Sequence, residues 1–249
     1  MKKTITRTVL ATLVLLLSLT FSSYAQIDYH DVYICGNTSV KLRPQESIIN
    51  ATDKVHWYLE GVEVAGSPFT YSTSGSADLT IPANLAVGLH KYTTAIESVG
   101  GCIGEISEPY EIYKLPTKTL ALTKSVGTYC GANSAVNGTS GSVITATTTP
   151  AASLPAGVEY AYTWSVTEGG NAATPGSADN STTATSQYTM TTSTVGTYIF
   201  NASVKYALSA GNTGTLVSAD TQGCSVDATA TQTVIVTPKP GKPTISLAN

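Results

Sequence analysis

The feature of this sequence that most constrains its fold is a pattern of cysteine and tryptophan that occurs twice. Its members are Cys35, Trp57 and Cys102 in the first copy, and Cys130, Trp164 and Cys224 in the second. In both copies a glycine follows the first cysteine and precedes the second. Four cysteines permit three pairings, and the repeat selects the pairing within each copy. We therefore predict the disulfides Cys35–Cys102 and Cys130–Cys224. A zinc site is the alternative use of four thiolates, but no pair has the C-x-x-C spacing typical of one.

Apolar and polar residues alternate around both tryptophans, which is the period of a strand with one buried face. Charged residues make up only 12% of the chain, and no helical period occurs beyond the N-terminal segment. Short strands separated by glycine-rich turns predict an all-β fold, two antiparallel β-sandwiches in tandem. The aromatic residues expected to fill the two cores are Trp57, Tyr92, Tyr162, Trp164 and Tyr198.

The N-terminal segment has the layout of a secretory signal peptide. Lys2, Lys3 and Arg7 precede an apolar run over residues 9–21, and a small-x-small cleavage site ends at Ala25. A membrane-spanning helix needs about 20 apolar residues, so an uncleaved anchor is the alternative. We expect a secreted or cell-surface protein with no membrane span in its mature part, and export permits disulfides to persist.

The expected organisation is a signal peptide over residues 1–25, a first sandwich over 26–115 and a second over 116–238. Residues 239–249 read as a proline-rich linker followed by the first strand of a truncated third repeat, because residues 244–248 are similar to residues 119–123. The alternative is a native C-terminal strand that pairs with the second sandwich.

The motifs of both copies resemble immunoglobulin-like and PKD-like domains of secreted and surface bacterial proteins. The matching positions are Cys35-Gly36, Trp57, Gly101-Cys102, Cys130-Gly131, Tyr162-x-Trp164, Gly196-Thr197-Tyr198 and Gly223-Cys224. The resemblance implies disulfides that tie the start of the second strand to the last hairpin. His90 stands where the second copy has Tyr198, so a tyrosine-corner hydrogen bond is expected only in the second copy.

Motifs for catalysis or metal binding are missing from the sequence. It contains no G-x-S-x-G, H-E-x-x-H or P-loop motif. Three groups of residues are candidates. His30 and Asp31 are candidates for two members of a Ser-His-Asp triad. Glu105, Glu108 and Glu111 form an acidic cluster, and Asp179, Asp220 and Asp227 are loop carboxylates considered for calcium. We interpret them as surface residues, as charges that blunt an edge strand, and as loop residues without EF-hand spacing. We expect no enzyme, no cofactor and no metal site.

Two features are candidates for binding. Tyr58, Tyr71, Tyr110 and Tyr113 are candidates for a sugar-stacking platform, although tyrosine is also an ordinary half-buried strand residue. The segment over residues 208–222 is rich in Gly, Ser and Thr. It is either a mobile hairpin insertion, which we favour, or the contact loop of a binder.

The predicted function is that of a non-catalytic β-sandwich repeat module that serves as a spacer or adhesion region. Its partners would be an extracellular protein or a glycan, and the parent protein would carry further repeats or a C-terminal domain. The alternative is a carbohydrate-binding accessory region of a secreted hydrolase. A net charge of −3 argues against nucleic acid as a partner.

Overall fold

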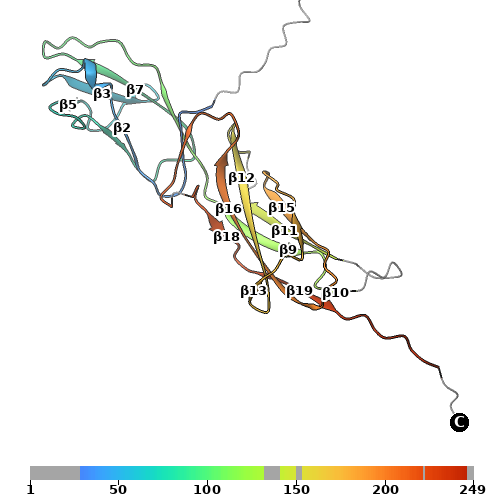
Figure 1. Ribbon diagram of the computed structural model, residues 1–249. Coiled ribbons are helices and arrows are strands. Elements are labelled where there is room, and N and C mark those ends of the chain that lie inside the picture. Colours follow the sequence, from blue (N-terminus) through green and yellow to red (C-terminus); the bar gives the residue numbers. More distant parts are fainter. Residues whose placement is uncertain (1–28, 132–140, 150–152, 221, 246–249) are drawn as a thin grey trace, which may run out of the picture.

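The computed structural model describes residues 29–131, 141–149, 153–220 and 222–245. The predicted signal peptide over residues 1–25 lies outside them. Two elongated β lobes lie end to end, and a chain segment extends from the far tip of the second (Figure 1). Within the described part, helix is limited to one 3-10 turn at Glu46–Ile48, and none of these residues forms a helix able to cross a membrane.

The first lobe contains eight strands and the 3-10 turn. They are β1 (Val32–Ile34), β2 (Val40–Leu42), η1 (Glu46–Ile48), β3 (Lys54–Leu59), β4 (Val62–Glu63), β5 (Phe69–Thr70), β6 (Leu79–Ile81), β7 (Gly88–Glu97) and β8 (Tyr110–Lys114). One sheet has the order β1-β8-β7-β3-β4, with β5 also paired to β3, and β2 and β6 form a second sheet. Most pairs are antiparallel, but β1 runs parallel to β8.

The core of the first lobe follows the alternation in β3. Val55 and Trp57 are buried there, and Trp57 is only 4% exposed. Its indole N–H donates to the carbonyl of Ala77 over 2.9 Å, so the one polar group of the ring is satisfied inside the core. Tyr92 of β7 is buried in the same cluster.

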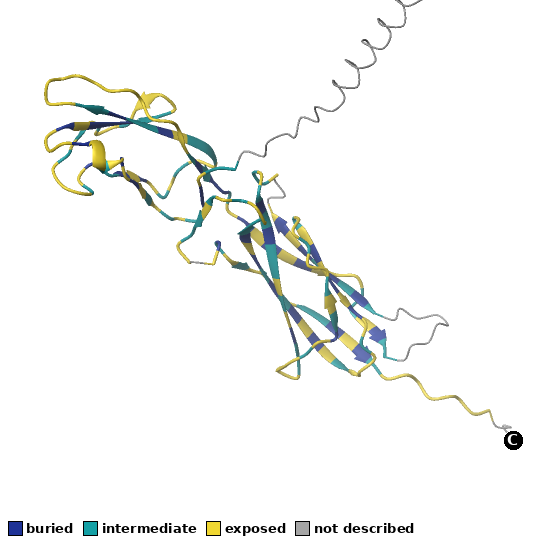
Figure 2. Cartoon of the chain, turned by 45° about the horizontal axis from the view of Figure 1, so that its top comes forward, coloured by how far each residue is buried: buried dark blue, intermediate teal, exposed yellow. Residues whose placement is uncertain are grey.

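The second lobe contains eleven strands by sequence. They are β9 (Thr119–Lys124), β10 (Thr128–Cys130), β11 (Ser142–Thr149), β12 (Val158–Glu168), β13 (Asn171–Ala172), β14 (Gly176–Ala178), β15 (Thr185–Met190), β16 (Gly196–Leu208), β17 (Thr215–Val217), β18 (Val226–Asp227) and β19 (Gln232–Thr237). The sheet β10-β19-β16-β12-β13, with β18 paired to β16, packs on the sheet β14-β15-β11-β9. Buried and exposed residues alternate along these strands (Figure 2), which is the pattern of a sandwich.

Two buried clusters fill the second lobe, one near the first lobe and one near the far tip. Tyr198 is buried in the far cluster. Trp164 and Tyr162 are only partly buried, and Trp164 packs against both clusters. Their polar atoms reach the facing sheet: the Trp164 N–H donates to Ser186 Oγ over 3.1 Å, and the Tyr162 hydroxyl lies 2.7 Å from Thr148 Oγ1. Trp164 therefore links two cores and does not fill one.

Both lobes contain a corner hydrogen bond. In the second lobe the Tyr198 hydroxyl donates to the carbonyl of Thr194 over 3.1 Å. In the first lobe His90 Nε2 lies 2.8 Å from the carbonyl of Ala86, also four residues back. A carbonyl only accepts, so this nitrogen carries the proton. The first lobe therefore has no tyrosine at this corner, as expected, and His90 makes the equivalent bond in its place.

The predicted disulfide pairing is also wrong. Cys35 is bonded to Cys224, with a Cα–Cα distance of 6.0 Å, and Cys102 and Cys130 are free thiols. In the first lobe, Cys35 follows the β1 residue that pairs with Lys114, which pairs with Gly88 at the start of β7. Cys102 follows the other end of this ten-residue strand, about 30 Å away at about 3.3 Å per residue. A disulfide requires Cα atoms within about 7 Å.

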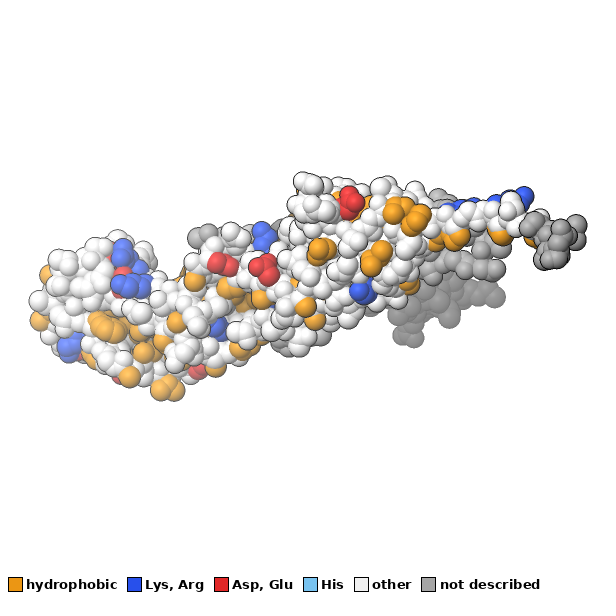
Figure 3. Space-filling view, turned by 90° about the horizontal axis from the view of Figure 1, so that it is seen from below, with side chains coloured by type: hydrophobic (Ala, Val, Ile, Leu, Met, Phe, Trp, Pro, Cys, Tyr) orange, Lys and Arg blue, Asp and Glu red, His pale blue; other side chains and the backbone are white. Residues whose placement is uncertain are grey.

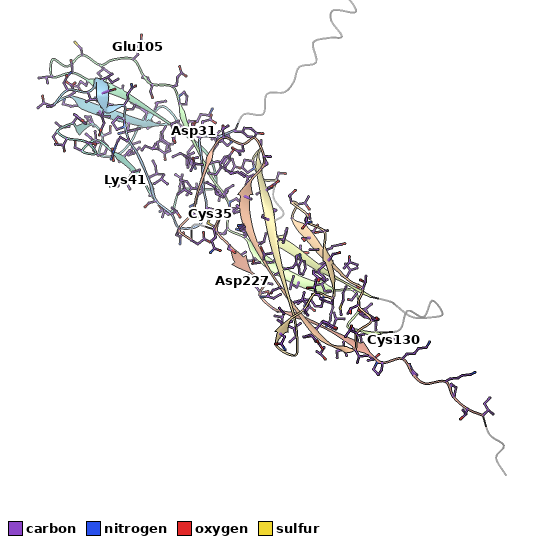
Figure 4. All side chains as sticks on the ribbon, viewed as in Figure 1. Asp31, Cys35, Lys41, Glu105, Cys130 and Asp227 are labelled. Atoms are coloured by element: carbon purple, nitrogen blue, oxygen red, sulfur yellow. A yellow bond between two sulfur atoms is a disulfide. The ribbon has the colours of Figure 1, made fainter. Side chains whose placement is uncertain are left out.

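The second lobe separates its cysteines in the same way. Cys130 pairs with Thr237 of β19, next to the register that begins β16 at Gly196. Cys224 follows Gly223, whose carbonyl accepts the N–H of Tyr206 near the opposite end of β16. Figure 4 places Cys35 between the lobes and Cys130 at the far tip. The repeated pattern therefore marks equivalent positions in the two lobes, which are not bonded within a lobe.

The two tryptophans are expected to differ in their contribution to stability. Trp57→Ala removes a buried ring and orphans the Ala77 carbonyl, so it should lower the free energy of unfolding by about 3–5 kcal/mol. Trp164→Ala removes a half-buried ring and should cost less. Urea unfolding of both variants measures the difference, and a larger loss for Trp164→Ala would contradict these placements.

Candidate functional site

The junction between the lobes is built from several distant parts of the chain. The segment over residues 208–222 does not form a free insertion. Its strand β17 pairs in parallel with β1 of the first lobe, with Val32 opposite Thr215 and Ile34 opposite Val217. The Thr215 N–H donates to the Asp31 carbonyl over 2.9 Å. The first lobe's sheet therefore ends on a strand that the second lobe supplies.

A disulfide closes the same junction. The Cys35 N–H donates to the Val217 carbonyl over 3.1 Å, and the Cys35 sulfur is bonded to Cys224, 189 residues away in sequence. A loop of that length corresponds to about 5 kcal/mol in the chain-entropy account of disulfides. Because this bond crosses from one lobe to the other, it restrains their relative orientation as well as the unfolded chain.

Tyr33 of β1 is a first-lobe residue whose side chain lies in the core of the second lobe. It is 0% exposed and belongs to the cluster nearest the junction. Its hydroxyl donates to the Ala156 carbonyl over 3.2 Å and accepts the Asn212 side-chain N–H over 3.1 Å. The Asn212 amide also donates to the Gly157 carbonyl over 2.8 Å. The lobes therefore share a core.

Lys118, just after the interlobe connection, lies beneath the disulfide. Its ammonium donates to the Cys224 carbonyl and lies 3.9 Å from the centre of the Tyr206 ring, a cation–π contact. The Tyr206 hydroxyl donates to the Pro116 carbonyl over 2.8 Å. Burial lowers the pKa of Lys118 to about 8, against the opposing charge of Asp220.

Asp220 holds the turn that carries Cys224. Its carboxylate accepts the backbone N–H groups of Gln222, Cys224 and Ser225 over 3.0, 3.0 and 2.7 Å. Burial raises the pKa of Asp220, but these hydrogen bonds outweigh it and hold that pKa well below its usual range. The carboxylate thus stays ionised and orders the backbone around the disulfide.

The other loop carboxylates differ in their surroundings. The Asp179 carboxylate accepts hydrogen bonds from Ser181 N, Gln187 N and Ser186 Oγ, and Asp227 is exposed on β18. The described residues contain no group of three or more side chains suited to a metal ion. The three aspartates considered for calcium therefore do not converge.

Two histidine–carboxylate groups lie on the first lobe. His56 Nδ1 lies 2.7 Å from Glu63 and His56 Nε2 lies 2.9 Å from Glu97, which also pairs with Lys54. Burial lowers the pKa of His56, but the hydrogen bonds to Glu97 and Glu63 raise it by more, so the net shift is upward. These carboxylates favour a protonated imidazole, which suits a structural ion pair better than a general base.

The side chains of His30 and Asp31 do not form the pair that a Ser-His-Asp triad requires, because each bonds to Glu111. His30 Nδ1 lies 2.7 Å from Glu111 Oε2, and Lys91 pairs with the other oxygen of that carboxylate over 2.7 Å. Asp31 accepts the backbone N–H of Glu111 over 2.7 Å. Glu111 is therefore ion-paired with His30 and Lys91, whereas Glu105 and Glu108 are exposed.

The four candidate tyrosines do not share a platform. Tyr58 stacks on His56 and Tyr113 stacks on His30, with ring centres 6.4 and 5.3 Å apart. Tyr71 packs against the first-lobe core. Tyr110, 41% exposed, lines a groove of about 330 Å³.

This groove runs along the first lobe beside β2, β7 and β8. Its lining is Lys41, Leu42, Arg43, Pro44, Gln45, Trp57, Tyr92, Thr94, Ser107, Glu108 and Tyr110. A second hollow shares Pro44, Gln45, Thr94 and Ser107 and continues toward Ile106. Polar groups beside an aromatic ring are chemically suited to a neutral polar ligand. The charged residues of the groove are Lys41, Arg43 and Glu108, and the face of the molecule seen in Figure 3 shows scattered charges of both signs.

These features define an all-β protein with two joined β-sandwich lobes. No family model matches the chain, and no curated protein is significantly similar to it. Among solved structures, it is similar to fibronectin(III)-like modules of Clostridium thermocellum CbhA, with 10% identity, a TM-score of 0.39, and coverage of 86% of this chain and 93% of that one. Murine CEACAM1b matches with 9% identity and a TM-score of 0.35, covering 85% and 100%. Bacteroides ovatus SGBP-B, solved with a mixed-linkage heptasaccharide, matches with 14% identity and a TM-score of 0.26, covering 84% and 43%.

The buried lysine makes the stability of the junction depend on pH. Burial lowers the pKa of Lys118 to about 8 in the folded chain, whereas the pKa of an unfolded lysine is about 10.4. The unfolded state therefore binds more protons between these values, and stability rises with pH across that window. Relative to Lys118→Met, the wild type should gain about 2 kcal/mol between pH 8 and 10.

Urea unfolding at pH 8, 9 and 10, with the free thiols alkylated beforehand, measures this gain. The matched control is Lys124→Met, because Lys124 is exposed and should leave the slope unchanged. Equal slopes for the wild type and Lys118→Met would contradict the assignment.

Proposed function

We propose that this chain is a non-catalytic extracellular module that acts as a rigid spacer and holds an adhesive or binding element away from a surface. The observation that carries the proposal is the junction. Tandem domains usually move relative to one another unless their interface is large and apolar. Here a parallel strand pair, a shared core and a disulfide all cross between the lobes.

The extracellular assignment rests on two independent features. The interlobe disulfide requires an oxidising compartment to persist, and residues 1–25 have the layout of a secretory signal. Within the proposed division, residues 26–115 and 116–238 are the two sandwich units. Residues 239–249 are a proline-rich linker with the first strand of a third repeat.

The proposed absence of catalysis is supported by how the histidines are bonded. The imidazoles of His30 and His56 pair with carboxylates, and that of His90 donates to a backbone carbonyl. None of these bonds connects an imidazole to a serine, threonine or cysteine. The arrangement that activates a nucleophile is thus not formed by these three residues in the structure.

Single-molecule energy transfer tests the rigidity, since the free thiols Cys102 and Cys130 provide native labelling sites on the two lobes. The wild type should give one narrow distance distribution. The Cys35→Ser/Cys224→Ser variant loses the covalent joint and should give a broader one. In the chain-entropy account its free energy of unfolding also falls by up to about 5 kcal/mol. A wild-type distribution as broad as that of the variant would contradict the spacer function.

A second candidate function is carbohydrate binding, and the groove beside β2 and β8 is the observation that favours it. Tyr110 is the exposed aromatic residue there, and Glu108 and Gln45 add polar atoms. An aromatic face with a few convergent polar groups is a common arrangement for a small polar ligand.

A polysaccharide retention assay tests this candidate. If the groove binds glycans, Tyr110→Ala should weaken retention at least fivefold, because Tyr110 is the exposed aromatic ring of the groove. Tyr58→Ala is the matched control, since Tyr58 alternates with the inward-facing Trp57 on β3 and stacks on His56 outside the groove. Equal retention of both variants, or no retention by the wild type, would exclude this role.

A further inference from the structure

The far tip of the second lobe presents the same strand arrangement that the first lobe presents at the junction. In each lobe a three-residue strand runs parallel to the strand that ends the lobe's own stretch of chain: β1 beside β8, and β10 beside β19. Ile34 pairs with Lys114, which places Cys35 beside the residue that precedes Pro116. Cys130 pairs with Thr237, which precedes Pro238. The two cysteines are therefore equivalent by register.

What differs is the outer edge of the short strand. In the first lobe β17 covers the outer edge of β1, and Cys224 bonds Cys35 beside it. In the second lobe β10 is the terminal strand of its sheet, as far as the described residues show. Cys130 is a partly exposed free thiol at the end of that strand. An open edge offers backbone groups to an added strand.

The segment that follows each joint is also similar. After β8 the chain continues as Leu115-Pro116-Thr117-Lys118, and Lys118 reaches the carbonyl beside the disulfide. After β19 it continues as Pro238-Lys239-Pro240-Gly241-Lys242, which is also rich in proline and lysine. Residues 239–245 form no strand, and Ile245 is 99% exposed. The part of the predicted third-repeat strand beyond residue 245 lies outside the described residues.

We infer that the β10 edge with Cys130 is a docking site for a further β-sandwich unit that carries a short strand followed by Gly-Cys, as β17 is followed by Gly223-Cys224. The unit adds its strand in parallel to β10 and forms a disulfide with Cys130. Two thiols lose two protons and two electrons in that step, and a small disulfide oxidant such as oxidised glutathione is reduced to two thiols. The inference extends the spacer proposal but does not depend on it.

The other tip of the molecule does not provide this partner. Cys102 is equivalent to Cys224, since it follows Gly101 on the return from β7 and its carbonyl accepts the Ser98 N–H over 2.9 Å. However, the connection from β7 to Cys102 is a tight turn without a strand. It therefore lacks the element that pairs along the edge of β1, and a second copy docking through Cys102 is disfavoured.

The experiment uses the full mature protein and a synthetic peptide over residues 214–226, which contains β17 and Cys224, in a glutathione redox buffer. Peptide mapping measures the rate of mixed-disulfide formation at Cys130 and at Cys102. Each rate is divided by the alkylation rate of the same thiol with iodoacetamide, which removes differences in intrinsic reactivity. The normalised rate at Cys130 should exceed that at Cys102 at least tenfold, although Cys102 is the more exposed thiol.

The matched control peptide carries Thr215→Pro, which removes the N–H that bonds the Asp31 carbonyl in the native joint while leaving the cysteine unchanged. It should lose the preference for Cys130. Equal normalised rates at the two thiols, or an unchanged preference with the control peptide, would overturn the inference. So would covalent multimers of the protein joined Cys130–Cys102 in preference to the peptide adduct. None of these results bears on the stiffness of the existing junction, so the two proposals fail separately.

Discussion

The structure depends on one strand, β17, that the second lobe adds to the sheet of the first. Strand β17 belongs to the second lobe by sequence but completes the sheet of the first, and the Cys35–Cys224 bond fixes it there. Strand pairing at one edge alone would allow the lobes to bend about that edge, and a disulfide alone would allow them to rotate about the bond. Tyr33, which is buried in the neighbouring core, is a third element that crosses between the lobes.

The polar groups at the junction are arranged to satisfy this buried contact. Lys118 bonds the Cys224 carbonyl, and Asp220 accepts three N–H groups from the same turn. Buried polar groups that lack partners are costly, so these contacts allow a loop rich in polar residues to lie against a core. The charged groups of Lys118 and Asp220 bond backbone atoms of the joint, and this arrangement supports the mechanical role proposed above.

Much of the fold could be predicted from local pattern. The alternation around Trp57 placed that ring in a core, and short strands between glycine turns predicted a β-sandwich. The disulfides could not be predicted in this way, since equivalent cysteines recur once per lobe whether they bond within a lobe or between lobes. Residues 208–222 were equally ambiguous, because a Gly- and Thr-rich segment has the same composition as a mobile loop and as an edge strand. The prediction of a tyrosine platform failed for a further reason. Strand period shows which residues share a face but not which other side chains pack on that face.

Local pattern in the sequence predicted the all-β fold, the repeat of the Cys–Trp–Cys pattern and the inward face of the strand that carries Trp57. These follow from local chemistry, because strand period and turn residues act over a few positions. Which cysteines bond, where β17 pairs and which groups the histidines contact are set only when the chain folds. Those choices depend on register across residues as far apart as Cys35 and Cys224. The two ends of a ten-residue strand lie about 30 Å apart. Whether two cysteines can bond therefore depends on whether the fold places them at the same end of such a strand.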